Sequence, residues 1–250
     1  MSQRVVVITG ASGGIGAALA EQLASRGDAV VLVARRADAL STVASRCGEH
    51  VLAITADVTS REAVRGVVSQ TLARFGQIDV WVNNVGQGIS RMPTELTDDD
   101  IDEMMLINVK SALYGMQETL THFRHRSTGQ VINVSSMLGR IPFAVQRAAY
   151  CGSKHFLNSL TANFRTEVQQ THPDIQITLV SPGVVRTEFG LNARHGGVDS
   201  RVLPDSQSAD EISAVIVGAI ESRAPDVYTR IGASGRVAAF YSTIGEDPAS

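Results

Sequence analysis

The sequence predicts an α/β fold, a doubly wound sheet of about seven parallel strands with helices on both faces. Apolar runs rich in Val and Ile alternate with helical patterns almost to the end of the chain. The runs are nearly continuous, as expected of strands buried on both faces of a parallel sheet. Strict alternation also requires right-handed crossovers between parallel strands. Because no internal repeat or Pro/Gly-rich linker occurs, we expect a single domain over residues 1–250.

The strands are expected, in chain order, at residues 4–9, 29–34, 51–55, 78–83, 130–135, 175–180 and, more weakly, 226–229. Between them, apolar residues recur every three or four positions, as an amphipathic helix requires. Phe156, Leu160 and Phe164 form one such set. Three acidic residues at 98–100 follow Thr97 and predict the start of another helix.

Two segments interrupt the alternation. Residues 188–207 are polar, contain glycine and show weak periodicity, so we expect a substrate loop there. The tail that starts at Arg230 carries a short apolar stretch, residues 237–241, which is expected to pack either on the core or on a partner subunit.

Composition argues against several classes of protein. The net charge of −3 and the pI near 6.1 provide no basic footprint for nucleic acid. No apolar run approaches the ~18 residues of a membrane-spanning helix, and the first residues lead into a strand without a signal-peptide pattern. Cys47 and Cys151 form no disulfide framework, and the His and Cys residues lack metal-ligand spacing. We therefore expect a soluble chain in a reducing cytoplasm, without a metal.

A glycine-rich turn, TGASGGIG at residues 9–16, follows the first strand. Gly10, Gly14 and Gly16 allow a tight turn and close approach to a ligand, and the next helix N-terminus favours a pyrophosphate. The turn therefore indicates a Rossmann-like dinucleotide site, in which Ser12 offers its hydroxyl and N–H to a phosphate. The same stretch fits the G-x-S-x-G elbow of hydrolases. That elbow needs strands upstream, and only nine residues precede Gly10.

The end of the second strand indicates which dinucleotide binds. It carries Arg35 and Arg36 where a protein that binds NAD has an acidic residue, and no carboxylate occurs before Asp38. Two guanidinium groups suit the 2′-phosphate of NADP(H). NADP(H) is therefore the preferred cofactor, with NAD(H) as the alternative.

Asp57 and Val58 follow the third strand. Thr59 and Glu62 have the spacing of a capping box, which would satisfy the start of the next helix. Asp57 would then remain free to bind an adenine amino group.

Tyr150 and Lys154 form the most specific pair in the chain. Of the 22 basic residues only Lys110 and Lys154 are lysines, and only four residues are Tyr. A Tyr-x-x-x-Lys pair would arise by chance with a probability of about 0.03. On a helix the two side chains share one face, so the ammonium should lower the pKa of the phenol. A drop of about three units corresponds to ~4 kcal/mol. A compact ammonium also suits two ribose hydroxyls better than a guanidinium does.

These residues resemble the short-chain dehydrogenase/reductase family over nearly the whole chain. TGASGGIG is similar to the family's TGxxxGxG turn, and PGVVRT at residues 182–187 is similar to its PG motif. NNVG at residues 83–86 resembles its NNAG turn, with Val85 in place of Ala. The resemblance implies cofactor contacts from Gly10, Ser12, Gly13, Gly14, Ile15, Gly16, Arg35, Arg36, Asp57, Val58, Asn84, Gly86, Tyr150, Lys154, Pro182, Gly183, Val185 and Thr187.

The family's catalytic tetrad falls on Asn108, Ser136, Tyr150 and Lys154. The interval between Ser136 and Tyr150 is one residue longer than usual, so the loop between them is expected to bulge. Ser136, rather than Ser135, matches the family's position.

The resemblance implies an NADP(H)-dependent oxidoreductase that interconverts a carbonyl and an alcohol by hydride transfer, with Tyr150 as general acid/base. Ser136 would bind the reacting oxygen. Asn108 is a poor residue for a helix interior, and it would kink its helix and hold a water that relays protons to Lys154. A homodimer or homotetramer is also implied. The alternative is a non-catalytic NAD(P)-sensing binding protein on the same fold.

A hydrophobic ketone or secondary alcohol is the expected substrate, because most residues near the site are apolar. The expected pocket wall consists of the 188–207 loop and Leu138, Ile141, Phe143 and Val145, with Gln146, Arg194 and His195 nearby. His155 should face away from the cleft, because adjacent residues on a helix diverge by about 100°. Cys151 is expected to be a packing residue.

Overall fold

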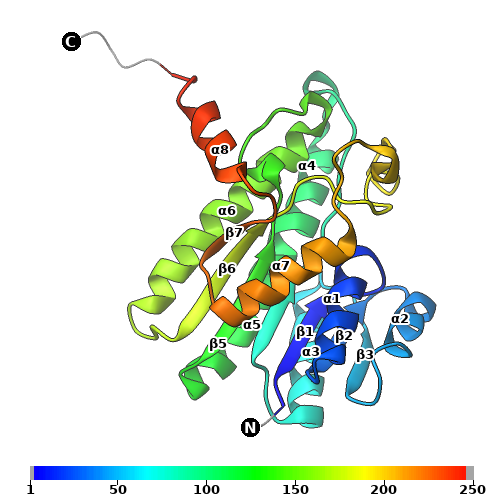
Figure 1. The fold of residues 1–250 in the computed structure, drawn as a ribbon, viewed down its shortest axis with the longest axis vertical. Helices are drawn as coiled ribbons and strands as arrows, with labels where there is room; N and C mark the ends of the chain where they lie inside the picture. Colours follow the sequence, from blue (N-terminus) through cyan, green and yellow to red (C-terminus); the bar gives the residue numbers. More distant parts are fainter. Residues whose placement is uncertain (1–2, 246–250) are drawn as a thin grey trace.

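The computed structural model describes residues 3–245 and contains a seven-stranded parallel sheet with the strand order β3-β2-β1-β4-β5-β6-β7 (Figure 1). The predicted fold class is confirmed. Each strand begins and ends within two residues of its prediction. The strands are β1 Val5–Thr9, β2 Ala29–Ala34, β3 Val51–Thr55, β4 Val80–Asn83, β5 Gly129–Val134, β6 Ile175–Ser181 and β7 Asp226–Tyr228.

Alternation along the central strands explains why the apolar runs are continuous. Val6 and Ile8 of β1 face a core shared with α1 (Gly14–Ser25), α2 (Ala37–Ala44) and α7 (Ala209–Ser222). Val5 and Val7 face a second core shared with α3 (Arg61–Phe75), α5 (Ser111–Arg126) and α6 (Ala148–Gln169). Each β1 side chain is therefore buried, and the sheet lies between two helix layers (Figure 1).

Helix α3 starts one residue later than the predicted capping box allows, so the prediction for Thr59 and Glu62 is wrong. Ser60 caps α3, and its hydroxyl accepts a hydrogen bond from the Ala63 N–H at 3.3 Å. The Thr59 hydroxyl instead donates to Asp57 Oδ1 at 2.8 Å. Because Asp57 engages the first hydroxyl, the cap passes to the second one.

The described part of the tail packs on its own chain. Helix α8 (Ala233–Tyr241) places Val237 and Phe240 against Ile141. The Tyr241 hydroxyl donates to the Arg140 carbonyl at 2.8 Å. Of the two expectations for this segment, packing on the core is the one that these contacts match.

The predicted substrate loop lies at the carboxyl edge of the sheet. Its residues form an irregular segment with a 3₁₀ turn at Ser200–Val202. Isolated bridges pair Ile89 with Arg194 and Val185 with Gln207. Since Ile89 follows β4 and Val185 follows β6, the segment covers strand ends at which parallel α/β sheets bind ligands.

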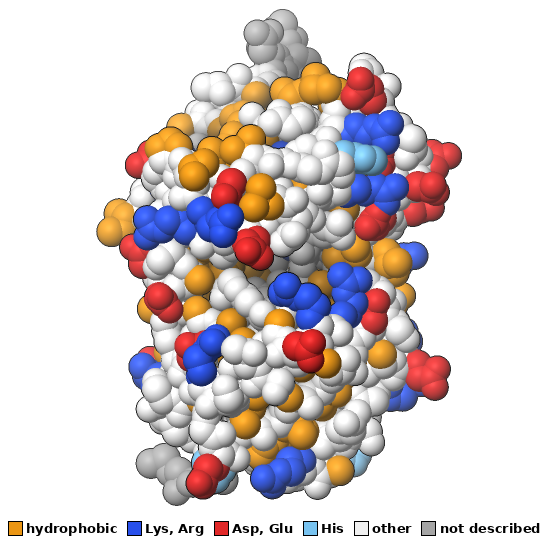
Figure 2. Space-filling model, turned by 90° about the vertical axis from the view of Figure 1, so that its right-hand side faces the viewer, with side chains coloured by type: hydrophobic (Ala, Val, Ile, Leu, Met, Phe, Trp, Pro, Cys, Tyr) orange, Lys and Arg blue, Asp and Glu red, His pale blue; other side chains and the backbone are white. Residues whose placement is uncertain are grey.

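Among residues 3–245, no helix is long and apolar enough to cross a membrane, and no cluster of three His, Cys, Asp or Glu is suited to a metal ion. Cys47 and Cys151 are buried free thiols. On the face drawn in Figure 2, acidic and basic side chains are interspersed.

Candidate active site

The glycine turn between β1 and α1 has a backbone that other residues would not adopt. Gly10 and Gly14 have φ values of +71° and +55°, in the region that favours glycine. A Cβ at Gly16 would lie 2.4 Å from the Gly10 carbonyl oxygen, so α1 approaches the turn too closely for any side chain. The Asn84 side chain donates to the Thr9 carbonyl at 3.0 Å and braces the turn against the end of β4.

Arg36 lies against this turn. Its guanidinium donates to Ser12 Oγ at 3.2 Å, and a Cβ at Gly13 would lie 3.6 Å from Nη2. Arg35 is 71% exposed, and its Nη1 is 3.9 Å from a carboxylate oxygen of Asp57. Asp57 is only partly engaged, because Oδ1 accepts two hydrogen bonds from Thr59 while Oδ2 lies beyond hydrogen-bond distance of Arg35, so its contact with an adenine amino group stays a prediction.

The segment after β6 approaches the same turn. A Cβ at Gly14 would lie 3.3 Å from Thr187 Cγ2, which places this threonine beside the start of α1. Gly183 lies under Arg230, since a Cβ there would be 2.8 Å from its Nε. Val185 packs on the core that contains α1. The glycine turn and the 182–187 segment therefore enclose one end of the cleft.

Asn108 lies in a π-helical turn, Leu106–Lys110, between α4 (Asp98–Met105) and α5. A π-turn thus interrupts the helix where a kink was predicted, and π-turns of this kind often occur at functional sites. The side chain is 1% exposed, which rules out an exposed polar helix position. Its amide accepts from the Gln87 N–H at 2.8 Å and donates to the Gln87 carbonyl at 3.0 Å and to Ser153 Oγ at 3.1 Å.

Lys154 is buried beside Asn108. Its Nζ donates to the Val134 carbonyl at 3.0 Å. A Cβ at Gly86 would lie 3.2 Å from Asn108 Oδ1 and 3.4 Å from Lys154 Nζ, so the two side chains converge on this glycine. Burial lowers the pKa of Lys154 to about 8, because the charged ammonium loses its hydration.

Tyr150 lies one turn before Lys154 on α6, with the ammonium 5.9 Å from the centre of its ring. Burial raises the pKa of Tyr150 to about 12, and a hydrogen bond with Ser136 counteracts part of this rise. In the protein without a bound cofactor, the expectation that Lys154 lowers the pKa of the phenol is therefore wrong. The physical reason is desolvation, the largest effect on this group, which disfavours the charged phenolate.

The structure separates the roles of the two adjacent serines. Ser135 donates to the side chain of Asn158, whose amide in turn donates to the Gly139 carbonyl at 2.6 Å. Ser136 accepts from the Leu138 N–H at 3.1 Å and interacts with Tyr150. The serine predicted to be in the site is thus the one beside the phenol. The loop that follows it bulges through two 3₁₀ turns, at Met137–Gly139 and Val145–Arg147.

The sequence analysis missed the anchor of the substrate loop, Asp100. Thr97 and Asp100 form a capping box at the start of α4, where a helix was predicted. The Asp100 carboxylate is fully buried and also binds Arg91, Arg194 and His195, at 3.1, 2.6 and 2.7 Å. Hydrogen bonds from His195 and Thr97 hold the pKa of Asp100 well below its ordinary range. In the sequence, Asp100 could not be distinguished from Asp98 and Asp99, which are exposed acidic residues of the same helix start.

The expected pocket wall is only partly correct. Leu138 packs in a cluster with Ile89 and Tyr150, and the ring of Phe189, from the substrate loop, meets that of Tyr150 edge-on at 5.7 Å. Ile141 instead lies under α8. Val145 of the predicted wall lines a different groove, and Arg194 and His195, expected near the wall, bind Asp100.

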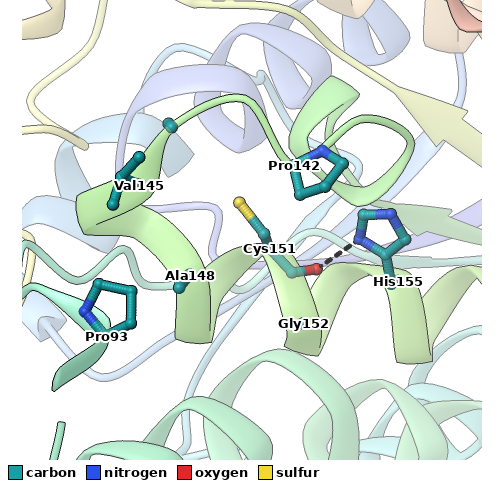
Figure 3. Close-up of a pocket in the computed structure, with 8 residues that line it drawn as sticks. Pro93, Pro142, Val145, Ala148, Cys151, Gly152 and His155 are labelled. Carbon is teal, nitrogen blue, oxygen red and sulfur yellow. Dashed lines mark hydrogen bonds between the residues drawn. The ribbon is translucent and has the colours of Figure 1, made fainter. Parts of the chain in front are cut away.

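That groove lies along the N-terminal turns of α6, as Figure 3 shows. It is lined by Pro93, Pro142, Val145, Cys151 and His155, among others, and by none of the four predicted catalytic residues. His155 Nδ1 donates to the Cys151 carbonyl at 2.8 Å (Figure 3). His155 was predicted to face away from the cleft, and it lines this separate groove.

A parallel sheet with a glycine turn after β1 and a buried Tyr–Lys pair at its carboxyl edge defines a Rossmann-like oxidoreductase. The family model described as short chain dehydrogenase matches residues 4–196. The chain belongs to this family and is a short-chain dehydrogenase/reductase.

Known proteins resemble the chain over most of its length. An uncharacterized oxidoreductase of Staphylococcus saprophyticus is 34% identical over 76% of this chain and 77% of its own. One from Staphylococcus aureus is 30% identical over 85% and 90%. An alcohol dehydrogenase of Thermococcus sibiricus, solved with 5-hydroxy-NADP, has a TM-score of 0.78 at 27% identity over 91% and 95%. A family member of Burkholderia phymatum, solved with NAD, shares the fold, with a TM-score of 0.87 at 21% identity over 100% and 98%.

Proposed function

We propose that the protein is an NADP(H)-dependent oxidoreductase that interconverts a carbonyl and an alcohol by hydride transfer, with Tyr150 as general acid/base. The observation that carries this proposal is the placement of Ser136 and Lys154 beside Tyr150, with Asn108 next to Lys154 at Gly86, at the sheet edge that also holds the glycine turn. A binding protein that only senses NAD(P) has no need of a buried proton donor. Binding of NADPH without turnover of any carbonyl compound would favour that alternative.

Each side chain has a separate task in the proposed reaction. The bound nicotinamide would supply or accept the hydride. Tyr150 would donate its proton to the carbonyl oxygen, and the Ser136 hydroxyl would stabilise the negative charge that develops there. Lys154 would bind ribose hydroxyls. The Asn108 side chain accepts a hydrogen bond from the Gln87 N–H and donates one to the Gln87 carbonyl. A water between Asn108 and Lys154 would relay protons.

The residues at the cofactor end fit a dinucleotide with a 2′-phosphate. The glycine turn has no side chain that would block a pyrophosphate. Arg36 reaches over Ser12 and Gly13, and Arg35 is exposed beside it. The cofactor 5-hydroxy-NADP in the Thermococcus sibiricus relative supports NADP(H), whereas NAD in the Burkholderia phymatum structure supports the alternative.

Replacing Arg35 and Arg36 by Gln should move the cofactor preference towards NADH. Loss of charge-assisted hydrogen bonds to the phosphate is expected to lower the ratio of kcat/KM for NADPH to that for NADH by about 10- to 100-fold per residue. Steady-state kinetics with both cofactors measures this ratio. Arg46→Gln is the control, because Arg46 lies after α2 and pairs with Glu21. An unchanged ratio in both Arg35 and Arg36 variants would contradict the NADP(H) assignment.

Carbonyl reduction should lose activity as the pH rises through about 8. The reaction needs the neutral phenol of Tyr150, which persists up to a pKa of about 12. It also needs the ammonium of Lys154, whose pKa is lowered to about 8. The protonated form is the active one, so kcat/KM should be constant below this pH and fall above it. If kcat/KM stays constant up to pH 10, the reaction does not require the ammonium of Lys154.

The proposal also includes a hydrophobic substrate, a location in the cytoplasm and a homo-oligomeric state. Ile89, Leu138 and Phe189 surround the phenol with apolar surface, which favours a substrate with a hydrophobic body. Two buried free thiols suit a reducing cytoplasm. Phe156 of α6 is 51% exposed, and such a helix face suits a homodimer or homotetramer. Light scattering in solution would reveal a monomer if this last point is mistaken.

A further inference from the structure

Arg147 places a guanidinium group under the substrate loop. It is the residue just before α6 and lies one helical turn ahead of Tyr150. A Cβ at Gly88 would lie 2.7 Å from its Nη1, and a Cβ at Gly197 would lie 2.9 Å from its Nη2. The guanidinium therefore lies between the segment after β4 and the 188–207 loop. Each of these segments contacts the guanidinium through a glycine, Gly88 and Gly197 respectively.

This guanidinium has no partner in the described part of the chain. Nη1 is buried without a hydrogen bond, and no Asp or Glu of residues 3–245 forms an ion pair with Arg147. Nearby arginines do find carboxylates: Arg91 and Arg194 bind Asp100, and Arg201 binds Asp199. An unpaired cation that is partly buried, with one nitrogen fully buried, is costly. Its position at the start of α6 adds an unfavourable interaction with the helix dipole, so the fold alone gives no reason for it.

Arg147 lies close to Tyr150, the proposed proton donor. Its charge interacts with the phenol of Tyr150. The Phe189 ring, which meets the Tyr150 ring at 5.7 Å, would lie 3.1 Å from the same Cβ at Gly88 that touches Arg147. A substrate that reaches the Tyr150 phenol beside Phe189 would therefore have the guanidinium close to it, within an otherwise apolar surrounding.

We propose that Arg147 binds a carboxylate of the substrate, so that the enzyme acts on oxo acids and the corresponding hydroxy acids rather than on neutral ketones. This inference rests on the proposed function and names its substrate class. A guanidinium accommodates a planar carboxylate through two parallel hydrogen bonds. A phosphate would require more positive charge than the site offers, because Arg91 and Arg194 are already paired with the carboxylates of Asp100 and Glu103. The apolar residues would contact the hydrocarbon part of the acid.

The test compares acids with their methyl esters on identical carbon skeletons, with the carbonyl two, three or four positions along the chain. NADPH oxidation by the wild type is expected to favour at least one acid over its ester by about 10²-fold in kcat/KM, because an ester leaves the guanidinium unpaired. Arg147→Met should remove this preference, lowering kcat/KM for the acid by about 10²-fold and changing that for the ester by less than about threefold. Arg147→Lys should recover part of it. Arg124→Met, an exposed change at the end of α5, is the control.

A binding measurement separates the two proposals. Calorimetric titration of the protein with the saturated carboxylic acid of the same chain length should show binding by the wild type and none by Arg147→Met. If acid and ester are reduced equally well, or if Arg147→Met slows both equally, Arg147 is a structural residue and the inference fails while the oxidoreductase stands. If no carbonyl compound is reduced at all, the proposed function fails. Loss of the calorimetric signal in Arg147→Met would still establish the carboxylate site.

Discussion

Replacing Tyr150 by Phe is expected to lower kcat for carbonyl reduction by about 10³-fold while the fold and the affinity for NADPH stay the same. The substitution removes only the hydroxyl. The ring keeps its edge-on contact with Phe189 at 5.7 Å and its place beside Leu138 and Ile89. Steady-state kinetics with an accepted carbonyl substrate, together with fluorescence titration of NADPH, measures both parts of the prediction.

Tyr114→Phe is the matched control for this experiment. Tyr114 lies on α5, where its ring contacts the Arg61 guanidinium at 4.5 Å and none of the proposed catalytic residues. Loss of its hydroxyl should leave kcat within about twofold, as expected of a change outside the reaction centre. A Tyr150→Phe enzyme that retained a tenth or more of the wild-type kcat would exclude the phenol as the proton donor.

The sheet could be predicted from the sequence because burial on both faces leaves a local signature. The continuous apolar run of β2, which is buried at every position, marked this strand at the bounds that the structure has, Ala29–Ala34. The start of β4 was placed two residues early, since Ile78 and Asp79 also look like strand residues. They are engaged otherwise: the Ile78 N–H donates to His122, and the Asp79 carboxylate accepts from the Val5 N–H and from Arg126. Such partners are 40 or more positions away, beyond the reach of a local pattern.

For the site, too, local features could be predicted from the sequence, and features that depend on distant residues could not. Spacing was enough to bring Tyr150 and Lys154 onto one face of α6, and the poor helix propensity of Asn108 was enough to predict a kink. Spacing could not supply the degree of burial, which decides the sign of the pKa shift at Tyr150. It also gave no sign of Asp100, whose partners Arg194 and His195 come from a loop almost a hundred positions later. An arginine just before a helix, Arg147, is unremarkable until the fold shows that it is unpaired.

Replacing Lys154 by Met should raise the free energy of unfolding at pH 7 while abolishing turnover. The ordinary lysine pKa of 10.5 falls to about 8 in the folded chain, so the unfolded chain binds this proton more tightly. Below pH 8 the folded state carries a penalty of about 3 kcal/mol, which declines as the pH rises from 8 to about 10.5. Met fills the same space without charge, but it leaves the Val134 carbonyl without its donor, which costs about 1 kcal/mol. The net gain at pH 7 is therefore about 1–2 kcal/mol.

Denaturant unfolding at pH 7 and pH 10 measures this gain, and Lys110→Met provides the control, because Lys110 is the other lysine and is exposed. The stability difference between Lys154→Met and the wild type should shrink by at least half at pH 10, whereas that of Lys110→Met should stay near zero at both. A Lys154→Met protein that is less stable than the wild type at pH 7 would mean that the ammonium stabilises the fold. If the gain is found together with loss of turnover, the buried charge persists despite its cost because the reaction needs it, as expected of active sites that trade stability for function.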